Sequence, residues 1–485
     1  MALALLLLIP LLAAVLTALP MERRAAPWPT LVGCAVVLGL AIRVAWLASR
    51  GVELSGLGGA FAVDALSALL VALIALVGAT AALFSWGYLA AGGAHRVLAS
   101  ASRTRLYYVL FNLFLASLLA VPLLSNLALV WVAVALTTLL SAFLVAHEDT
   151  PEALEAAWKY VILTTVGAVL ALLGIVLLYW SLRQTGGTDF TWPGLARAAG
   201  RMPHAPLWAG FLLILIGFGT KAGLAPMHTW LPDAHGQAPA PICALLSGVE
   251  TSTALYVILR LAPILDGAGL PRARTWMLGF GIGSVAVAAL LLIRVRDYKR
   301  MFAYSTVEHM GIILAAAGFA GGGFGVAFQI AAHALAKSLC FYAAGAVLLT
   351  TGTQQIADLR GLLRSAPAVA LGLLTATLAV AGAPPFAVFM SELAVFKQGL
   401  AGARYGAVAL LALFVVIAFC AMLRHVQRIV FGADPATDET PPMPRIPRAC
   451  LTTLVVAALP VLVLGLYLPP FLRDLLSAAG RAISG

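Results

Sequence analysis

Charged side chains are scarce in this sequence. Asp, Glu, Lys and Arg make up 10% of its 485 residues and hydrophobic residues 62%, whereas a soluble globular domain usually has about 25% charged residues. The composition excludes an ordinary soluble protein and predicts a multi-pass protein of the cell (cytoplasmic) membrane. A net charge of +11 would suggest nucleic acid as the partner of a soluble chain, but most arginines here lie between apolar runs. Because such arginines set topology and contact anionic lipid, we expect a lipid bilayer and no nucleic acid.

The sequence also lacks the motifs of redox and nucleotide sites. Its cysteines form no C-x-x-C pair, which argues against an iron–sulfur cluster, a zinc site and a disulfide framework. No Gly-rich dinucleotide fingerprint and no Walker loop follows a strand pattern. We therefore expect no cofactor, no metal and no catalytic residue in this chain, so the electrons of any coupled redox reaction would travel elsewhere. The five cysteines are Cys34, Cys243, Cys340, Cys420 and Cys450.

Long apolar runs fill most of the chain. About fourteen of them are long enough to cross roughly 30 Å of hydrocarbon, which predicts an all-α fold of about fourteen transmembrane helices. The first twenty residues lack the basic region of a signal peptide, and we interpret them as the first helix. A short amphipathic tail follows the last span. The expected spans are 2–19, 28–49, 61–90, 106–124, 126–146, 159–180, 207–231, 240–264, 275–294, 302–320, 324–350, 366–398, 404–431 and 449–468.

The seventh and twelfth spans are both interrupted near the middle by glycine and proline. The interrupting residues are Gly223 and Pro226 in one span, and Gly382, Pro384 and Pro385 in the other. Such a pair of broken spans indicates inverted repeats with sites near the bilayer midplane, so we expect two inverted five-helix repeats. The divisions are N-terminal helices 1–3 (1–105), the first repeat of helices 4–8 (106–264), the second repeat of helices 9–13 (265–431), and helix 14 with the tail (432–485).

Lys221 lies inside the apolar run of the seventh span. A lysine costs roughly 2.5 to 3.5 kcal/mol at a bilayer centre, so it is a functional-site hypothesis by default. Pro226 and Pro232 then predict two breaks in the helix, and the backbone groups freed there need partners in protein or in a wet cavity. The other candidates in this segment are His228, Asp233 and His235.

Carboxylates occur in further spans. Glu250 lies well inside the eighth span, where it must be either protonated or paired with a cation such as Lys221. Glu392 lies near the break of the twelfth span and is a candidate for the same reason. Asp64, at the start of the third span, is expected to cap a helix or pair with a loop and not to move protons.

The eleventh span places Gln329, His333 and Lys337 at i, i+4 and i+8, on one helical stripe. A histidine one turn from a buried lysine can pass a proton without a large driving force. The alternative is a polar stripe that only fixes helix packing through hydrogen bonds.

Two more positions have alternative interpretations. Glu308 and His309 open the tenth span and are either part of a proton relay or an interfacial anchor. Lys159 heads the sixth span beside Trp158 and Tyr160, which is typical of an interfacial belt, although a buried partner is possible.

The buried charges cannot remain unpaired. Lys221, Glu250, Lys337 and Glu392 together would cost on the order of 10 kcal/mol if unpaired in hydrocarbon, so they must face one another or water. The sequence therefore predicts a chain of Lys, His and Glu near the midplane, between two broken helices. The chemistry that suits such a chain is proton hopping through a hydrated path.

These motifs resemble the antiporter-like proton-conducting membrane subunits of respiratory complex I, Mrp-type cation/proton antiporters and membrane-bound hydrogenases. Within that family they are most similar to the F subunits of hydrogenase-4 and formate-hydrogenlyase-type complexes. The resemblance covers roughly spans three to thirteen. It rests on Thr220–His235, Ala238–Pro241, Ala244–Gly248, Ala303–Gly311, His333–Ser338, Pro384–Phe386 and Ser391–Leu393.

The resemblance implies fourteen helices with two inverted repeats and a central polar axis. By motif position, Lys221 matches the broken-helix lysine of a first half-channel, Lys337 and His333 the connecting pair, and Glu392 the last carboxylate of a second half-channel. It also implies partners, namely sister antiporter-like subunits, a quinone-site-like membrane subunit and a peripheral hydrogenase-like or dehydrogenase arm that bears the metal centres.

The sequence departs from the family at the partner of Lys221. Members usually have a glutamate in span five, in the neighbourhood where this chain reads Trp131 to Thr137 without an acid. Relatives tend to have an apolar residue at the position of Glu250. Our hypothesis is that Glu250 replaces the missing acid, which requires its carboxylate to lie within about 8 Å of Lys221 or to reach it through water.

Three functions remain open at this point. The first is a proton-translocating subunit of a redox-driven complex, hydrogenase-like or complex-I-like. The second is a component of a Mrp-type Na⁺/H⁺ antiporter or a related ion-coupled transport assembly. The third is a scaffold subunit with a degenerate first half-channel, for which the missing acid is the argument.

Overall fold

The fold is described from a computed structural model that covers residues 2–92, 100–319, 321–432 and 446–484. Its first half contains α1 (Ala2–Ala18), α2 (Trp28–Ser49), β1 (Leu54–Gly56), β2 (Phe61–Val63), α3 (Ala65–Ala90), α4 (Ala101–Leu123), α5 (Leu127–Val145), α6 (Pro151–Gln184), α7 (Trp192–Ala198), α8 (His204–Ala222), α9 (Trp230–Gln237), α10 (Ala240–Leu245), the π-helix η5 (Leu246–Glu250) and α11 (Thr251–Gly267). Four short 3₁₀ turns are η1 (Leu57–Gly59), η3 (Ala146–Glu148), η4 (Ala199–Arg201) and η6 (Ile356–Asp358).

The second half of the described chain is helical apart from η6 and its turns. Its helices are α12 (Arg272–Leu292), α13 (Tyr298–Gly318), α14 (Gly323–Thr351), α15 (Leu362–Ser365), α16 (Pro367–Val380), α17 (Ala387–Ala401), α18 (Tyr405–Phe431), α19 (Arg448–Leu466) and α20 (Pro470–Ser484). The all-α fold expected from the apolar runs is therefore confirmed.

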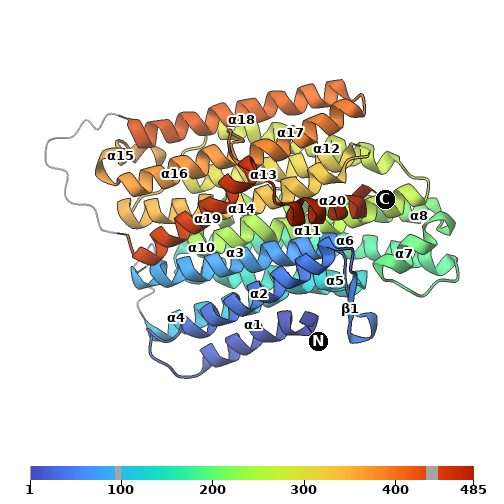
Figure 1. Cartoon of the computed structure of the whole chain (residues 1–485), viewed down its shortest axis with the longest axis horizontal. Coiled ribbons are helices and arrows are strands. Elements are labelled where there is room, and N and C mark those ends of the chain that lie inside the picture. Colours follow the sequence, from blue (N-terminus) through green and yellow to red (C-terminus); the bar gives the residue numbers. More distant parts are fainter. Residues whose placement is uncertain (1, 93–99, 320, 433–445, 485) are drawn as a thin grey trace.

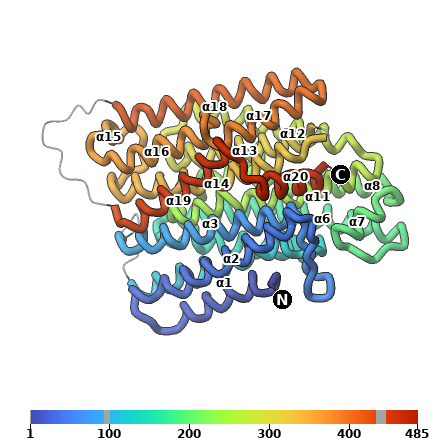
Figure 2. The backbone as a smooth tube through the Cα atoms, viewed as in Figure 1, coloured from blue at the N-terminus to red at the C-terminus, as the bar shows by residue number. Residues whose placement is uncertain are grey.

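The long helices lie side by side along one common direction (Figures 1 and 2). The antiparallel β1–β2 hairpin, which pairs Leu54 with Val63, lies at one end of the bundle together with α7. We call this the hairpin end. The described N-terminal and C-terminal residues, at the start of α1 and the end of α20, also lie toward this end (Figure 1).

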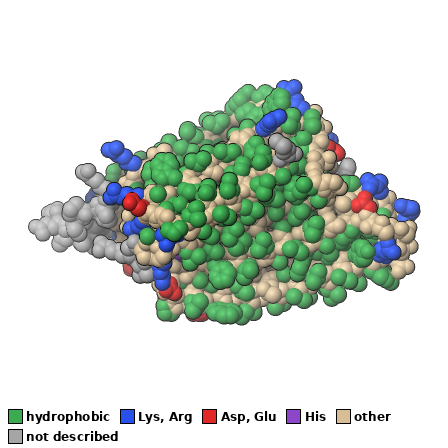
Figure 3. All heavy atoms as spheres, turned by 90° about the horizontal axis from the view of Figure 1, so that it is seen from below, with side chains coloured by type: hydrophobic (Ala, Val, Ile, Leu, Met, Phe, Trp, Pro, Cys, Tyr) green, Lys and Arg blue, Asp and Glu red, His purple; other side chains and the backbone are tan. Residues whose placement is uncertain are grey.

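The surface agrees with a membrane protein. Figure 3 shows hydrophobic side chains over the middle of one face, with the charged side chains gathered toward the ends of the bundle. In the described part of the chain, eleven helices are long and apolar enough to cross a membrane. The expected spans that fall short of this measure are α1, which has 17 residues, α13, which carries several charges, and the broken pair α16 and α17.

Several expected boundaries need correction. Residues 61–63 form β2, so the third span begins as a helix only at Ala65. Helix α6 begins at Pro151, because Thr150 caps it and proline is tolerated in a first turn. Pro232 does not break a helix, since it lies in the first turn of α9, where backbone N–H groups have no intrahelical acceptor. The fourth predicted division includes residues 433–445, which lie outside the described residues.

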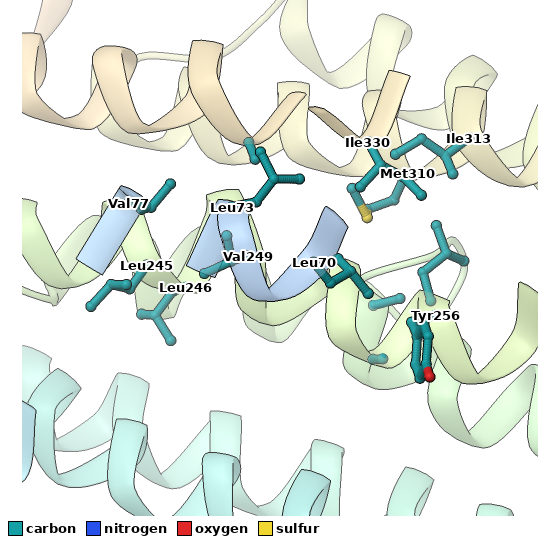
Figure 4. Close-up of a cluster of buried hydrophobic side chains, with 14 of the residues drawn as sticks. Leu70, Leu73, Val77, Leu245, Leu246, Val249, Tyr256, Met310, Ile313 and Ile330 are labelled. Atoms are coloured by element: carbon teal, nitrogen blue, oxygen red, sulfur yellow. The ribbon is translucent and has the colours of Figure 1, made fainter. Parts of the chain in front are cut away.

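The most deeply buried helices are those that bear the polar candidates. The segment formed by α10, η5 and α11 is buried along its length, and α14 nearly so. Large apolar side chains from α3, η5, α13 and α14 pack between them (Figure 4). The amphipathic tail expected at the C-terminus is α20, which packs its apolar face on α14 and α3.

Candidate functional site: a buried polar chain

The first helix break follows Lys221 by two residues. Helix α8 ends at Ala222, and Gly223 adopts the left-handed conformation at φ 78°, which glycine tolerates without strain. The Trp230 Nε1–H donates to the Thr220 carbonyl over 2.8 Å and so satisfies a backbone acceptor at the end of α8. The break therefore holds the last turn of α8, with Lys221 on it, inside the protein.

The Lys221 ammonium is surrounded by oxygen atoms. Its Nζ donates to Glu250 Oε1 at 2.6 Å, to the Tyr160 hydroxyl at 2.5 Å and to Thr138 Oγ1 at 2.8 Å. The Lys221 and Glu250 side chains are only 3% and 1% exposed. An ion pair this deeply buried is costly to separate, so its charge state is tied to the groups around it.

Glu250 comes from the π-helix η5, which directly precedes α11. Its Oε1 also accepts from the Tyr160 hydroxyl at 3.0 Å and from Ser141 Oγ at 3.2 Å, whereas its Oε2 has no hydrogen-bond partner among the described residues. The contact that the sequence predicted between Glu250 and Lys221 is present. Helix α5, which lacks the acid that the resemblance implies, contributes the Thr138 hydroxyl instead.

Sequence reasoning missed three members of this cluster. Thr138 and Ser141 lie one turn apart on α5, and their hydroxyls leave no signal in an apolar run. Tyr160 was interpreted as part of an interfacial belt, but it is fully buried against Lys221. A signal was available, because Thr138 and Ser141 follow the segment where the missing acid was expected.

A second cluster surrounds Lys337 on α14. Its Nζ donates to the Phe302 carbonyl at 2.7 Å and to Ser305 Oγ, both on α13. One turn earlier, His333 Nε2 lies 2.9 Å from the Ser247 carbonyl of η5. Because η5 presents Glu250 to Lys221 and the Ser247 carbonyl to His333, this π-turn joins the two clusters.

The next group along the axis contains Glu308 and His309 of α13. Both are buried, which argues against the alternative of an interfacial anchor. His309 Nε2 lies 2.9 Å from the carbonyl of Val380, the last residue of α16. The ring centroid of His309 lies 5.3 Å from that of His333. Each helix break thus has a carbonyl that accepts from an aromatic or imidazole N–H.

Gln329 links this group to the second broken helix. Its Nε2 lies 3.3 Å from His309 Nδ1, and its Oε1 accepts from Ser391 Oγ at 2.5 Å. Glu392, the next residue of α17, is buried with its carboxylate against Gly382 in the break. The expected stripe of Gln329, His333 and Lys337 therefore faces polar partners on α13, η5 and α17.

The histidines of the first broken segment are positioned differently. His235 is fully buried, with Nδ1 2.8 Å from the Leu231 carbonyl and Nε2 without a hydrogen-bond partner in the part of the chain that the structure describes. Its ring packs on Phe341 at 5.4 Å, one helical turn from Lys337. The ring of His228 lies 6.5 Å from that of Tyr304, and no described residue hydrogen-bonds to its Nδ1.

Asp233 and Lys159 lie nearer the surface than the buried chain. The Asp233 carboxylate accepts from Lys159 at 3.3 Å and from Arg300 at 2.8 Å, and Lys159 also pairs with Glu155 at 2.6 Å. The Lys159 side chain is 49% exposed. It lies inside α6 and not at its head, because α6 begins earlier than predicted. These ion pairs border the buried chain at the end opposite the hairpin.

At the hairpin end, Asp64 pairs with Arg260. Asp64 caps α3 by accepting from the Ser67 N–H at 3.0 Å, as expected, but its charge partner is the helix residue Arg260, at 2.5 and 2.6 Å. Burial acts to raise the pKa of Asp64, but the Arg260 guanidinium and the hydrogen bonds from Arg260 and Ser67 hold that pKa below its ordinary value. Arg260 was overlooked in the sequence, although it lies in the same apolar span as Glu250.

The buried groups alternate between donors and acceptors that can exchange protons. These amines, imidazoles and carboxylates can take up and release protons, and the Tyr160 hydroxyl joins Lys221 to Glu250. In the described part of the chain no group of His, Cys, Asp and Glu side chains could hold a metal ion. The arrangement of these titratable groups suits proton movement along the buried axis.

Comparison with known proteins gives consistent matches. The family described as NADH:quinone oxidoreductase/Mrp antiporter, transmembrane, matches residues 124–419. A hydrogenase-4 component F homolog of Methylacidiphilum infernorum is 38% identical over 422 residues, with 85% of this chain and 86% of the relative covered.

Two solved structures are similar over nearly the whole chain. One is a chain of the membrane-bound sulfane sulfur reductase, an archaeal respiratory membrane complex, with 25% identity, a TM-score of 0.86 and coverage of 99% of this chain and 97% of that one. The other is a chain of the Mrp complex from Dietzia sp. DQ12-45-1b, with 22% identity, a TM-score of 0.87 and coverage of 100% and 99%. The second match is a likeness of fold.

Proposed function

Because the chain belongs to the NADH:quinone oxidoreductase/Mrp antiporter transmembrane family, we propose that it is the proton-translocating membrane subunit of a redox-driven complex of the hydrogenase-4 or complex I type. Protons move along the buried chain near the midplane. The electrons travel through a peripheral hydrogenase-like or dehydrogenase arm, and sister antiporter-like subunits and a quinone-site-like subunit lie beside this one in the membrane.

The observation that supports this function best is the buried pair of Lys221 and Glu250 at 2.6 Å. Moving the Glu250 carboxylate away would leave the ammonium without its counter-charge and favour release of a proton. Returning the carboxylate would favour uptake. A conformational change in the complex can thereby be converted into proton movement at Lys221. His333 and Lys337 are the next proton carriers.

The remaining candidates have graded roles in this proposal. His235, Glu308 and His309 are buried beside the axis and serve as intermediate carriers, and Glu392 serves the second broken helix. Asp233 and Lys159 belong to the surface where protons enter or leave, with His228 close by. The two five-helix repeats remain our proposal for how these groups came to lie between two broken helices.

Replacement of the buried lysines tests the function. In membrane vesicles that contain the intact complex, we expect Lys221→Ala and Lys337→Ala to abolish substrate-driven acidification, measured with a pH-sensitive dye, because each removes a carrier. Redox turnover should continue. Lys397→Ala is the matched control, since Lys397 is exposed on α17, and it should pump normally. Normal pumping in both buried-lysine variants would instead support the scaffold function.

The Mrp-type alternative rests on the likeness of fold to the Mrp complex of Dietzia. It predicts exchange of Na⁺ for protons in vesicles without any redox substrate. Our proposal predicts no such exchange, so a single measurement of dye response to added Na⁺ separates the two functions.

A further inference from the structure

A cavity of about 420 Å³ opens at the hairpin end, away from the buried chain. It lies between the end of α2, the start of α3, α7, α11 and α20. Its walls combine small apolar residues with charged ones. Those that matter below are Glu53, Asp64, Trp192, Ala196, Arg260 and Ala478.

Two of the residues that line this cavity carry a buried N–H group without an acceptor among the described residues. They are Trp192 Nε1, on a side chain 7% exposed, and Arg260 Nε, on a side chain 11% exposed. A buried N–H without an acceptor costs about 1 to 3 kcal/mol. The cavity is large enough for many waters, because one water needs only about 10 to 15 Å³ of the space open to the centre of a water-sized sphere. The cavity therefore has room for water beside the Glu53 and Asp64 side chains.

Hydroxyl groups lead inward from the cavity. Arg260 Nη2 donates to Ser67 Oγ at 2.8 Å, and Ser67 Oγ lies 3.0 Å from the Tyr256 hydroxyl. Arg260 also lies over the Tyr256 ring at 5.0 Å, and the Trp192 ring meets that ring edge-on. Arg260 thus fixes both hydroxyls beside the cavity while its own charge is held by Asp64.

An apolar barrier separates these hydroxyls from Glu250. Tyr256 follows Glu250 by six residues, or about 9 Å along the helix. Figure 4 shows Leu70 between Val249, the residue before Glu250, and Tyr256, with the Tyr256 hydroxyl at the border of the apolar cluster. The cavity and the buried chain are therefore close along α11 but closed off from each other in this conformation.

We propose that this cavity is an aqueous, cation-attracting mouth through which the hairpin end exchanges protons with Lys221 and Glu250, behind an apolar seal at Leu70. This inference rests on the proposed function. A hydronium ion in the cavity gives a proton to Ser67 Oγ and becomes water, as Ser67 passes its own proton to Tyr256. Tyr256 passes its own proton to the Glu250 carboxylate when the seal opens, so each hydroxyl retains one proton. Arg260 stays charged throughout and positions the hydroxyls.

Thiol accessibility tests the mouth independently of proton pumping. We expect Ala478→Cys, in the full complex in sealed vesicles or proteoliposomes of known orientation, to react with small charged methanethiosulfonates. The trimethylammonium reagent should react at least threefold faster than the sulfonate, because Glu53 and Asp64 outnumber Arg260. Glu53→Gln should narrow that ratio. The native Cys420, exposed on the apolar face of α18, is the internal control and should react with neither reagent.

Ala196→Cys, on the opposite wall, serves if the first variant does not fold. Reaction of the introduced thiol with an apolar maleimide but with neither charged reagent would mean that lipid fills the cavity, which would overturn the inference. Faster reaction with the sulfonate would overturn the predicted charge of the mouth.

A second experiment links the mouth to function. Tyr256→Phe should lower proton translocation at least fivefold with redox turnover retained, whereas Tyr342→Phe, which removes an equally buried hydroxyl bonded to Thr80, should not. If Lys221→Ala abolishes pumping but Tyr256→Phe leaves it unchanged, the proposed mouth is contradicted and the proposed function is not. If Lys221→Ala itself pumps normally, the proposed function is contradicted.

The seal is tested by making it polar. Leu70→Ser should raise the passive proton permeability of proteoliposomes severalfold, because water can then bridge Tyr256 and Glu250. Leu119→Ser, equally buried in α4, is the control for a loosened core. Unchanged permeability in the folded Leu70→Ser variant would contradict the seal.

Discussion

At the scale of single residues, the partner of Lys221 decides how the first half of the protein works. The carboxylate reaches the ammonium from η5, while α5 supplies only the Thr138 and Ser141 hydroxyls. A hydroxyl can relay a proton but cannot balance a charge. The scaffold interpretation, which rested on the missing α5 acid, therefore loses its main argument, because a counter-charge is present on another element.

This arrangement predicts a rescue. Glu250→Gln should lower proton translocation by roughly tenfold, equivalent to about 1.4 kcal/mol, and destabilise the protein by about 3 to 5 kcal/mol, because it leaves a buried ammonium unpaired. Adding Thr138→Glu, whose position contacts Lys221 from α5 at 2.8 Å, should restore both pumping and thermal stability. Thr137→Glu with Glu250→Gln is the control one position away. Equal rescue by both double variants would argue against a specific pair.

Sequence reasoning could find the charged members of the site but not their polar surroundings. Lys221, Glu250, Lys337 and Glu392 stand out because charges are rare in apolar runs. Tyr160 does not, because an aromatic residue suits an interface and a core equally well. Only the packing of α6 against α8 decides which of the two it occupies.

At the scale of helices, both breaks depend on glycine in the left-handed conformation. Gly382 has φ 76°, and a Cβ there would meet the Glu392 carboxylate. The glycine and proline pattern located both breaks from sequence alone. It could not show that Pro232 continues a helix, since a proline in a first turn and a proline in a break look the same in sequence.

Substitution of Gly382 tests the second break. Gly382→Ala should cost at least about 1 kcal/mol for the left-handed backbone conformation, and more for the crowding of Glu392, so we expect a lower melting temperature together with reduced proton translocation. Gly279→Ala is the matched control, because that helical glycine has open space around its Cβ position and alanine favours helix. Similar behaviour of the two variants would mean that the break tolerates a side chain.

At the scale of the whole molecule, the polar groups are sorted by depth. The chain from Lys221 to Glu392 is buried, whereas the pairs of Asp233 with Lys159 and of Asp64 with Arg260 lie toward opposite ends of the bundle. Hydropathy alone predicted the membrane class and most helices. The depth of each charge could not be read from it, because depth depends on which helices surround a span.

The close packing of α12 and α13 has a consequence for biosynthesis. Helix α13 carries Lys299, Arg300 and Glu308 and is not among the eleven helices apolar enough to span by themselves. Gly281 and Gly311 let its backbone approach that of α12 closely. In a glycosylation-mapping assay, we expect α13 alone to insert poorly and α12 with α13 to insert together. Efficient insertion of unmodified α13 alone would contradict this expectation. The Glu308→Leu variant of α13, which lacks the buried charge, should insert efficiently by itself. Because α12 is synthesised before α13, it is already available as a packing partner when α13 enters the membrane. The buried polar axis therefore forms during synthesis and depends on the order of the helices in the chain.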